Sequence, residues 1–221
     1  MDFSTTGNTS GGGIIVVSQL PIGASPFTVS GWFKHADLST EANLIQWGVA
    51  TSSHCVLLGI NNAVMNLRNQ SSGAPPFIGI KNVYGQWRMF ALTYDGTTAS
   101  IYVDGILDVS GPYTFDTSAT GVWSIGYGFV TADHWDGALA DIRAYNRCLS
   151  ASEIKYLHGP HSYSFSTNGL LAWYKMDEFK NGNNIAPDEI MDSSSFRIVR
   201  SDLNNIAGGP LTKITPPLRY P

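Results

Sequence analysis

Residues 86–107 read QWRMFALTYDGTTASIYVDGIL, and this stretch decides the fold. β-branched and aromatic residues flank Asp95-Gly96 on both sides, as is typical of strands. Asp-Gly pairs supply the positive φ angles that tight hairpin turns require, and a second pair follows at Asp104-Gly105. The stretch therefore predicts an antiparallel meander with strands at 87–94 and 99–103.

The same kind of pattern recurs roughly every ten residues along the chain, with Gly, Asn, Asp or Pro in between. Further strands are predicted at 14–17, 27–33, 43–48, 56–60, 63–68, 77–81, 121–126 and 138–145. One short helix is predicted after Ser150, because Ser150 and Glu153 have the spacing of a capping box. This spacing of strands predicts an all-β fold, an antiparallel β-sandwich of the jelly-roll kind.

The amino-acid composition narrows the range of functions that the protein can have. The chain has 221 residues, 23 of them Gly, which suits one large all-β domain with many turns. Its net charge is −4 and its 13 Lys and Arg are scattered, so a nucleic-acid partner is not expected. No apolar run approaches the roughly 18 residues of a membrane span. The first residues do not look like a signal peptide, which predicts a mature start or a location such as a virion surface or the cell exterior reached by a non-classical route.

The two cysteines, Cys55 and Cys148, leave two structures open. They could form a disulfide between strands, or both could be small buried side chains. Neither has a CxxC partner, so a thiolate metal site is not expected.

Five segments follow one another in a characteristic order: FTVSGWFK at 27–34, GQWRMFALTYDG at 85–96, IYVDG at 101–105, SIG at 124–126 and WDGALADIRAYNRCLS at 135–150. This order resembles the laminin-G-like jelly-roll domains of the concanavalin A-like lectin/glucanase group. The resemblance covers about residues 1–158 and implies one β-sandwich over that range. Members of the group are mostly carbohydrate-binding or protein-binding modules, so the resemblance implies binding.

Residues 159–221 are predicted to hold an additional strand and an extended C-terminal arm. The segment 169–178 resembles the opening strand that precedes many such domains. It either adds a strand to the same sandwich or is the remnant of a second repeat. The tail is rich in proline, which a central strand does not accommodate. We expect residues 160–221 to attach the protein to a larger assembly or to a second copy.

No metal, cofactor or catalytic activity is expected. The acidic calcium-associated residue of the resembled family falls at Ala140, and the family's acidic loop is replaced by GNTSGGG at 7–13. A calcium ion requires six to eight oxygen ligands. Glycoside hydrolysis requires two carboxylates placed on either side of the scissile bond, and the four Glu residues show no such spacing. A Gly-x-Ser-x-Gly elbow is also missing.

The predicted binding surface is the loop 127–136, and its candidate carbohydrate-binding residues are Tyr127, Asp133, His134, Trp135 and Asp136. Aromatic rings stack on the C–H surfaces of sugars, and carboxylate and imidazole groups bind hydroxyls. Trp135 also stands at an aromatic core position of the resembled family, so burial is the alternative for this residue. The predicted function is a non-catalytic, lectin-like module on a larger assembly, with a glycan or protein surface as its partner. The alternative is a purely structural virion decoration, tail or fibre component anchored through the arm.

Overall fold

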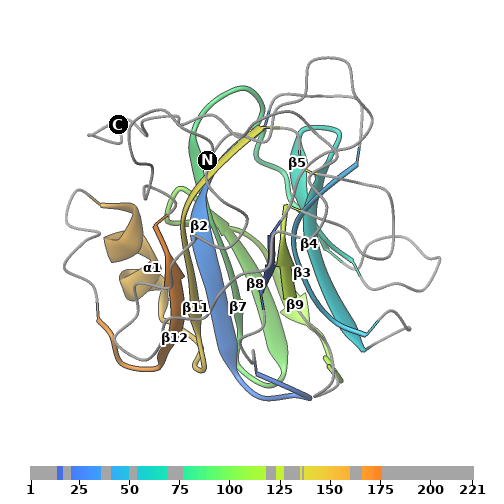
Figure 1. Ribbon diagram of the computed structural model, residues 1–221, viewed down its shortest axis with the longest axis vertical. Helices are drawn as coiled ribbons and strands as arrows, with labels where there is room; N and C mark the ends of the chain where they lie inside the picture. Colours follow the sequence, from blue (N-terminus) through green and yellow to red (C-terminus); the bar gives the residue numbers. More distant parts are fainter. Residues whose placement is uncertain are drawn as a thin grey trace.

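The computed structural model describes residues 14–16, 21–35, 41–49, 54–68, 77–117, 123–126, 135, 137–159 and 166–175, and the statements below concern these residues. Tyr127, Asp133, His134 and Asp136 lie outside the described residues, and so does the predicted arm from 176 onward. The described chain forms two antiparallel sheets, A and B, that face each other, with one helix on the outer side of sheet A (Figure 1).

Sheet A has the strand order β12-β11-β2-β7-β8-β9, and sheet B has the order β1-β10-β3-β4-β5-β6. The strands of sheet A are β2 (Phe27–His35), β7 (Arg88–Tyr94), β8 (Thr98–Val103), β9 (Ile106–Pro112), β11 (Gly137–Tyr145) and β12 (Leu170–Tyr174). Those of sheet B are β1 (Ile14–Val16), β3 (Ala42–Gly48), β4 (Cys55–Asn61), β5 (Val64–Arg68), β6 (Phe77–Ile78) and β10 (Trp123–Ile125). The fold class predicted from strand spacing is confirmed.

The main core lies between the two sheets and is rich in aromatic side chains. Phe27 is at its centre, with its ring centroid 4.9 Å from that of Trp47 and 5.4 Å from that of Phe115. Tyr94 packs edge-on against Phe115 at 4.7 Å. Edge-to-face aromatic pairs add about 0.5–1.5 kcal/mol each beyond the area that they bury. Trp123, from β10, belongs to the same cluster.

The helix α1 (Ala151–His158) covers the outer face of sheet A. Its buried residues Ile154 and Leu157 pack with Trp32 of β2 in a second apolar cluster. The predicted capping box is present, because the Glu153 N–H donates to the Ser150 side chain and the Glu153 side chain accepts from the Ser150 backbone. Sheet A is therefore covered on both faces. Among the described residues no helix is long and apolar enough to cross a membrane.

Two edge strands differ from the prediction. Strand β6 ends at Ile78 rather than at residue 81, because the backbone N–H groups of Ile80 and Lys81 donate to the Asp108 carboxylate instead of a strand partner. Strand β9 was not predicted. Its side chains are mostly exposed, so it lacks the alternation that burial imposes on a sequence.

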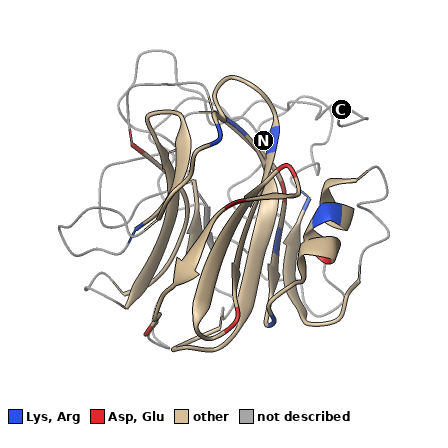
Figure 2. Cartoon of the chain, turned by 180° about the vertical axis from the view of Figure 1, so that it is seen from behind, with Lys and Arg blue, Asp and Glu red and all other residues tan. Residues whose placement is uncertain are grey.

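Strand β12 pairs with β11 in sheet A, which confirms that the segment after Gly169 adds a strand to the same sandwich. The two cysteines do not form a disulfide with each other, and Cys55 is buried whereas Cys148 is half-buried. The disulfide is therefore not formed, and burial as a small side chain holds for Cys55 but not fully for Cys148. Charged residues of the described chain are scattered over strands, turns and the helix α1 in the view of Figure 2.

Candidate functional site

The loop predicted to bind sugars leaves sheet B at Gly126 and returns at Trp135. The backbone N–H of Gly126 donates to the Leu44 carbonyl at 2.9 Å, and the backbone N–H of Trp135 donates to the Gly126 carbonyl at 3.0 Å. Both ends of the loop are therefore held at the beginning of β3. The other four residues of the prediction lie outside the described residues, and their role stays a prediction.

Trp135 is a core residue. Its side chain is fully buried, its ring meets Phe33 edge-on at 5.6 Å between centroids, and it lies 4.9 Å from the His35 ring. An aromatic side chain stacks on a sugar only if one ring face is accessible. Trp135 therefore supports the loop from within the sandwich, which is the alternative that the sequence left open for it.

The face of sheet B that points away from the main core is mostly polar near Gly126, where this loop begins. Leu57, which pairs with Gln46 and Arg68, is an apolar residue of the same face. Successive side chains of a strand point to opposite faces, and Val56, Leu58 and Ile60 of β4 point into the core. The pairing of β10, β3, β4 and β5 then places a set of polar side chains on the opposite, outward face. We call this set the polar face, and its members are Asn43, Gln46, Asn66, Arg68 and Ser124.

A bulge in β3 brings two of these side chains onto one face. Asn43 and Gln46 are three residues apart, so in a regular strand they would point in opposite directions. The register of β3 against β4 shifts between Asn43 and Ile45. A β-bulge inserts one residue and re-aims the side chains that follow it. Asn43 and Gln46 consequently share the outward face of sheet B.

A cluster of charged and amide side chains forms the rim of the polar face. Arg68 binds Glu41 through Nη1, and its Nη2 donates to Asn43 Oδ1 at 2.8 Å. Asn61 Nδ2 donates to the other Glu41 oxygen at 2.5 Å. The Glu41 side chain is 40% exposed and the Arg68 side chain 14%. The rim is thus accessible, and its positive and negative charges compensate each other.

Two carboxamides of the polar face have no hydrogen-bond partner among the described residues. Gln46 and Asn66 are 0% and 1% exposed, and within the described part of the chain neither the oxygen nor the nitrogen of either side chain has a partner. A buried polar group left unpaired costs about 1–3 kcal/mol. Native proteins rarely carry such groups without a bound water, ion or functional reason. These two side chains are the strongest indication of a ligand on this face.

The polar face and the predicted loop meet at one place. Asn43 directly precedes Leu44, whose carbonyl holds the Gly126 end of the loop. The rim residue Glu41 lies two positions before Asn43. A ligand that reaches the rim of the polar face would therefore also lie near the point where loop 127–134 leaves the sheet.

The carboxylates of the described residues are engaged in protein contacts. Glu41 binds Arg68 and Asn61, whereas Glu153 pairs with Arg147 at 2.6 Å on the opposite side of the sandwich, at α1. Glu178 and Glu189 lie outside the described residues. No group of three or more His, Cys, Asp or Glu residues with metal-site geometry occurs in the described ranges.

Asp141, next to the position where the resembled family places its calcium-associated acid, is held inside the protein. One oxygen lies 2.8 Å from Arg143 Nη2, and the other accepts from Trp173 Nε1 at 2.6 Å. Its backbone has a φ of 56°, at the irregularity between Ala140 and Arg143 where β11 pairs with β2. This carboxylate stabilises the bulge and the pairing of β12.

Sequence reasoning missed the polar face. Asn is depleted in strands. In the sequence, each Asn or Gln of these strands is indistinguishable from any other polar residue of an alternating pattern. A signal was present: the strands 42–48 and 64–68 carry carboxamides outward where exposed strands more often carry Thr, Lys or Glu. Their shared face and their burial depend on strand pairing, which the sequence does not state.

Comparisons with known proteins agree with the fold. The family model of the concanavalin A-like lectin/glucanases superfamily matches residues 8–155. No curated protein matched the chain.

Among solved structures, a candidate carbohydrate-binding protein from Bacteroides ovatus aligns with a TM-score of 0.64 and 19% identity over 96% of this chain. This chain spans 61% of that protein. A sialidase carbohydrate-binding module (CBM40) from Ruminococcus gnavus, solved with α2,3-sialyllactose, aligns with a TM-score of 0.52 and 20% identity over 66% of this chain and 96% of its own. Domain 4 of the arabinanase AbnA from Geobacillus stearothermophilus, solved with arabinotriose, gives 0.54 and 23% over 68% and 74%.

At identities of 19–23%, the solved structures show the shared fold alone. The family model matches more than half of the chain and therefore shows the family. With its two facing antiparallel sheets and this match, the chain belongs to the concanavalin A-like lectin/glucanases superfamily.

Proposed function

We propose that this protein is a non-catalytic carbohydrate-binding module whose glycan site lies on the polar face of sheet B, beside loop 127–134. The observation that carries the proposal is the pair of buried, unpartnered carboxamides, Gln46 and Asn66. A carboxamide donates through nitrogen and accepts through oxygen, which matches the paired hydroxyls of a sugar ring. Family membership and the carbohydrate-binding proteins of the same fold support this reading.

The rim favours a neutral glycan. Arg68 is the cation of the site, and it is already bound to the Glu41 carboxylate and to Asn43. An acidic sugar would have to displace Glu41, and like-charge repulsion from that carboxylate would oppose it. A neutral sugar can add hydrogen bonds to the accessible Glu41 oxygens without breaking the pair. Gln46 and Asn66 are 0% and 1% exposed, so a sugar hydroxyl reaches them only if it enters this buried face.

The arrangement of the carboxylates is the reason why we propose binding without catalysis. Retaining glycosidases hold two carboxyl groups about 5–5.5 Å apart and inverting enzymes about 6.5–9.5 Å apart. The rim of the polar face holds one described carboxylate, Glu41, and that group is neutralised by Arg68. Binding without cleavage is therefore the function that these residues support.

Attachment to a larger assembly through residues 160–221 is a separate hypothesis. Of this range the structure describes 166–175, where β12 is already paired with β11 inside the sandwich. Residues 176–221 lie outside the description, so the assembly role and any oligomeric state stay predictions.

A glycan array followed by calorimetric titration tests the proposal. Wild-type protein is expected to bind neutral glycans in preference to sialylated ones. Gln46→Leu, which keeps the volume of the side chain and removes its amide, is expected to weaken binding at least ten-fold, because the ligand hydroxyl then loses its partner. Ser100→Ala on β8 of the opposite sheet is the control and should bind like wild type. Absence of binding to any glycan at millimolar concentration, or unchanged affinity of Gln46→Leu, would overturn the proposal.

A further inference from the structure

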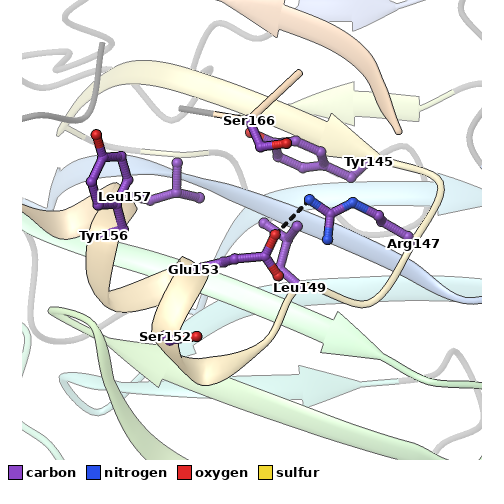
Figure 3. A pocket seen from close by; sticks show the side chains of 8 residues that line it. All are labelled: Tyr145, Arg147, Leu149, Ser152, Glu153, Tyr156, Leu157 and Ser166. Atoms are coloured by element: carbon purple, nitrogen blue, oxygen red, sulfur yellow. Dashed lines mark hydrogen bonds and ion pairs between the residues drawn. The ribbon is translucent and has the colours of Figure 1, made fainter. Parts of the chain in front are cut away.

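A second site lies on the other side of the molecule, between α1 and the end of β11. A cavity of about 330 Å³ opens there, lined by the end of β11 and the connection that follows it, by residues of α1 and by Ser166 before β12. Figure 3 shows these side chains, with Arg147 and Glu153 pointing toward each other. Because α1 covers the outer face of sheet A and the polar face belongs to sheet B, the two sites are on opposite sides of the sandwich (Figure 1).

The lining of this cavity, which we call the helix pocket, is mainly apolar. Tyr145, Leu149 and Leu157 are buried and form its inner wall. The Tyr156 ring stands at the opening and is 45% exposed. An apolar wall together with an accessible aromatic ring is the usual lining of a small-molecule pocket, whose volume is typically about 300–1,000 Å³. The pocket is large enough for one aromatic ring with a short substituent.

One polar group of the helix pocket, the Tyr145 hydroxyl, has no hydrogen-bond partner in the described part of the chain. Tyr145 is 1% exposed, and no described residue forms a hydrogen bond with its hydroxyl. Burial raises the pKa of Tyr145 to about 12, so the phenol stays protonated and can donate a hydrogen bond at neutral pH. The hydroxyl oxygen is itself buried, so a ligand that penetrates to it would supply the missing partner.

The two charged groups of the pocket wall, Arg147 and Glu153, form an ion pair, so their charges compensate each other. Arg147 Nη2 lies 2.6 Å from Glu153 Oε1, and Ser150 donates from both its backbone and its hydroxyl to Glu153 Oε2 at 2.9 Å. A charged ligand would have to break this arrangement. A sugar would bring several hydroxyls against the apolar inner wall, where they would lose their partners in water.

We propose that the helix pocket binds a small, uncharged aromatic molecule that carries one hydrogen-bonding group, with the ring against Leu149, Leu157 and Tyr156 and the polar group on the Tyr145 hydroxyl. This site is independent of the glycan site proposed above. It shares no residue with the polar face, and loss of one activity leaves the other intact.

Titration of full-length ¹⁵N-labelled protein with phenol and with toluene, followed by NMR, tests this proposal. Both probes carry the ring, and phenol alone carries a hydrogen-bonding group. We expect both to shift the amide signals of α1, with phenol the tighter ligand. Tyr145→Phe removes the hydroxyl and keeps the ring, and it should weaken phenol about five-fold while leaving toluene within two-fold of wild type.

Two further variants locate the site. Ser152→Trp places a large ring at the exposed edge of the pocket, where the fold has room for it, and it should abolish the binding of both probes. Tyr84→Phe, a matched change at an exposed tyrosine of another region, should leave both unchanged. The proposal is overturned by absence of binding of both probes to wild type, by equal loss of toluene and phenol in Tyr145→Phe, or by unchanged binding in Ser152→Trp.

Discussion

Arg147 Nη2 lies 2.6 Å from Glu153 Oε1, and this ion pair joins the chain just after β11 to the first turn of α1. The same guanidinium donates from Nε to the Asn168 carbonyl at 2.7 Å, immediately before β12. One side chain therefore connects the helix to the loop that leads into the last strand of sheet A. The hydrogen bond from Arg147, together with those from Ser150, lowers the pKa of Glu153 from 4.5 to about 2.

The first prediction concerns the pH dependence of this pair. Because the folded-state pKa of Glu153 is depressed, its contribution to stability is complete above about pH 5 and is lost as the pH falls toward 2. The Glu153 side chain is 36% exposed, so solvent screening limits the contribution to about 1 kcal/mol. Urea denaturation should show Glu153→Gln to be less stable than wild type at pH 7 and equal to it at pH 2. A difference of the same size at both pH values would contradict the ion-pair explanation.

The second prediction concerns the stability of the polar face. Replacing Gln46 or Asn66 by Leu removes a buried polar group that has no described partner, and should raise the free energy of unfolding by about 1–2 kcal/mol in the absence of glycan. Asn43→Leu is the matched control, because Asn43 accepts a hydrogen bond from Arg68 and its loss should destabilise. Chemical denaturation of the three variants gives the signs. If Gln46→Leu and Asn66→Leu are destabilised as much as Asn43→Leu, both amides have structural partners and the glycan site loses its main support.

The third prediction concerns Asp104, the first residue of the second Asp-Gly turn. Its carboxylate binds Lys81 and Arg88 at 2.8 Å each and accepts from the Met89 N–H at 3.1 Å. Burial acts to raise the pKa of Asp104, but these hydrogen bonds outweigh it and hold the pKa below its ordinary value.

Asp104→Ala is therefore expected to cost about 2–3 kcal/mol, since it removes three hydrogen bonds and leaves Ala at a φ of 53°. Asp104→Asn keeps one acceptor and tolerates positive φ, so it should lose less. Equilibrium unfolding in urea measures both, and equal losses would mean that the charge alone accounts for the effect.

The fourth prediction concerns the thiols. Cys55 and Cys148 form no disulfide with each other, so the melting temperature should be the same with and without a reductant, and the intact mass should be that of the reduced chain. Burial raises the pKa of Cys148, which lowers its thiolate fraction and slows its alkylation at pH 8 relative to a small-molecule thiol. Cys55 is buried and should react only after unfolding. A shift of the melting temperature on reduction would show a disulfide in solution.

Much of the sandwich could be predicted from local sequence because its signals are local. The Asp-Gly turns of residues 86–107 form as predicted, and Gly96 and Gly105 take φ angles of 105° and 73°. The capping box at Ser150 likewise needs only residues within one helical turn. Strand β9 escaped prediction because an exposed edge strand is not required to alternate, and β6 was shortened by Asp108, which lies 28 positions beyond Ile80.

The candidate sites were harder to predict, since each depends on side chains far apart in the sequence. Asn66 and Gln46 belong to different strands, and Tyr145 and Ser166 approach each other only after α1 and β12 have packed on sheet A. The predicted loop 127–136 was chosen for its aromatic and acidic composition. Of its candidate residues the structure describes Trp135, which composition alone could not place inside or outside the sandwich.

The sequence by itself determined most of the described strands, their turns and the capped helix, because steric limits on φ and ψ and the period of two act over a few neighbouring residues. Only the tertiary structure decided which polar side chains share a face and which are buried. The β3 bulge turns Asn43 to the side of Gln46, and sheet packing encloses Trp135 and leaves the Tyr145 hydroxyl without a described partner. Burial and long-range pairing are properties of the assembled sheets, so the sites that depend on them appear only once the sheets have packed.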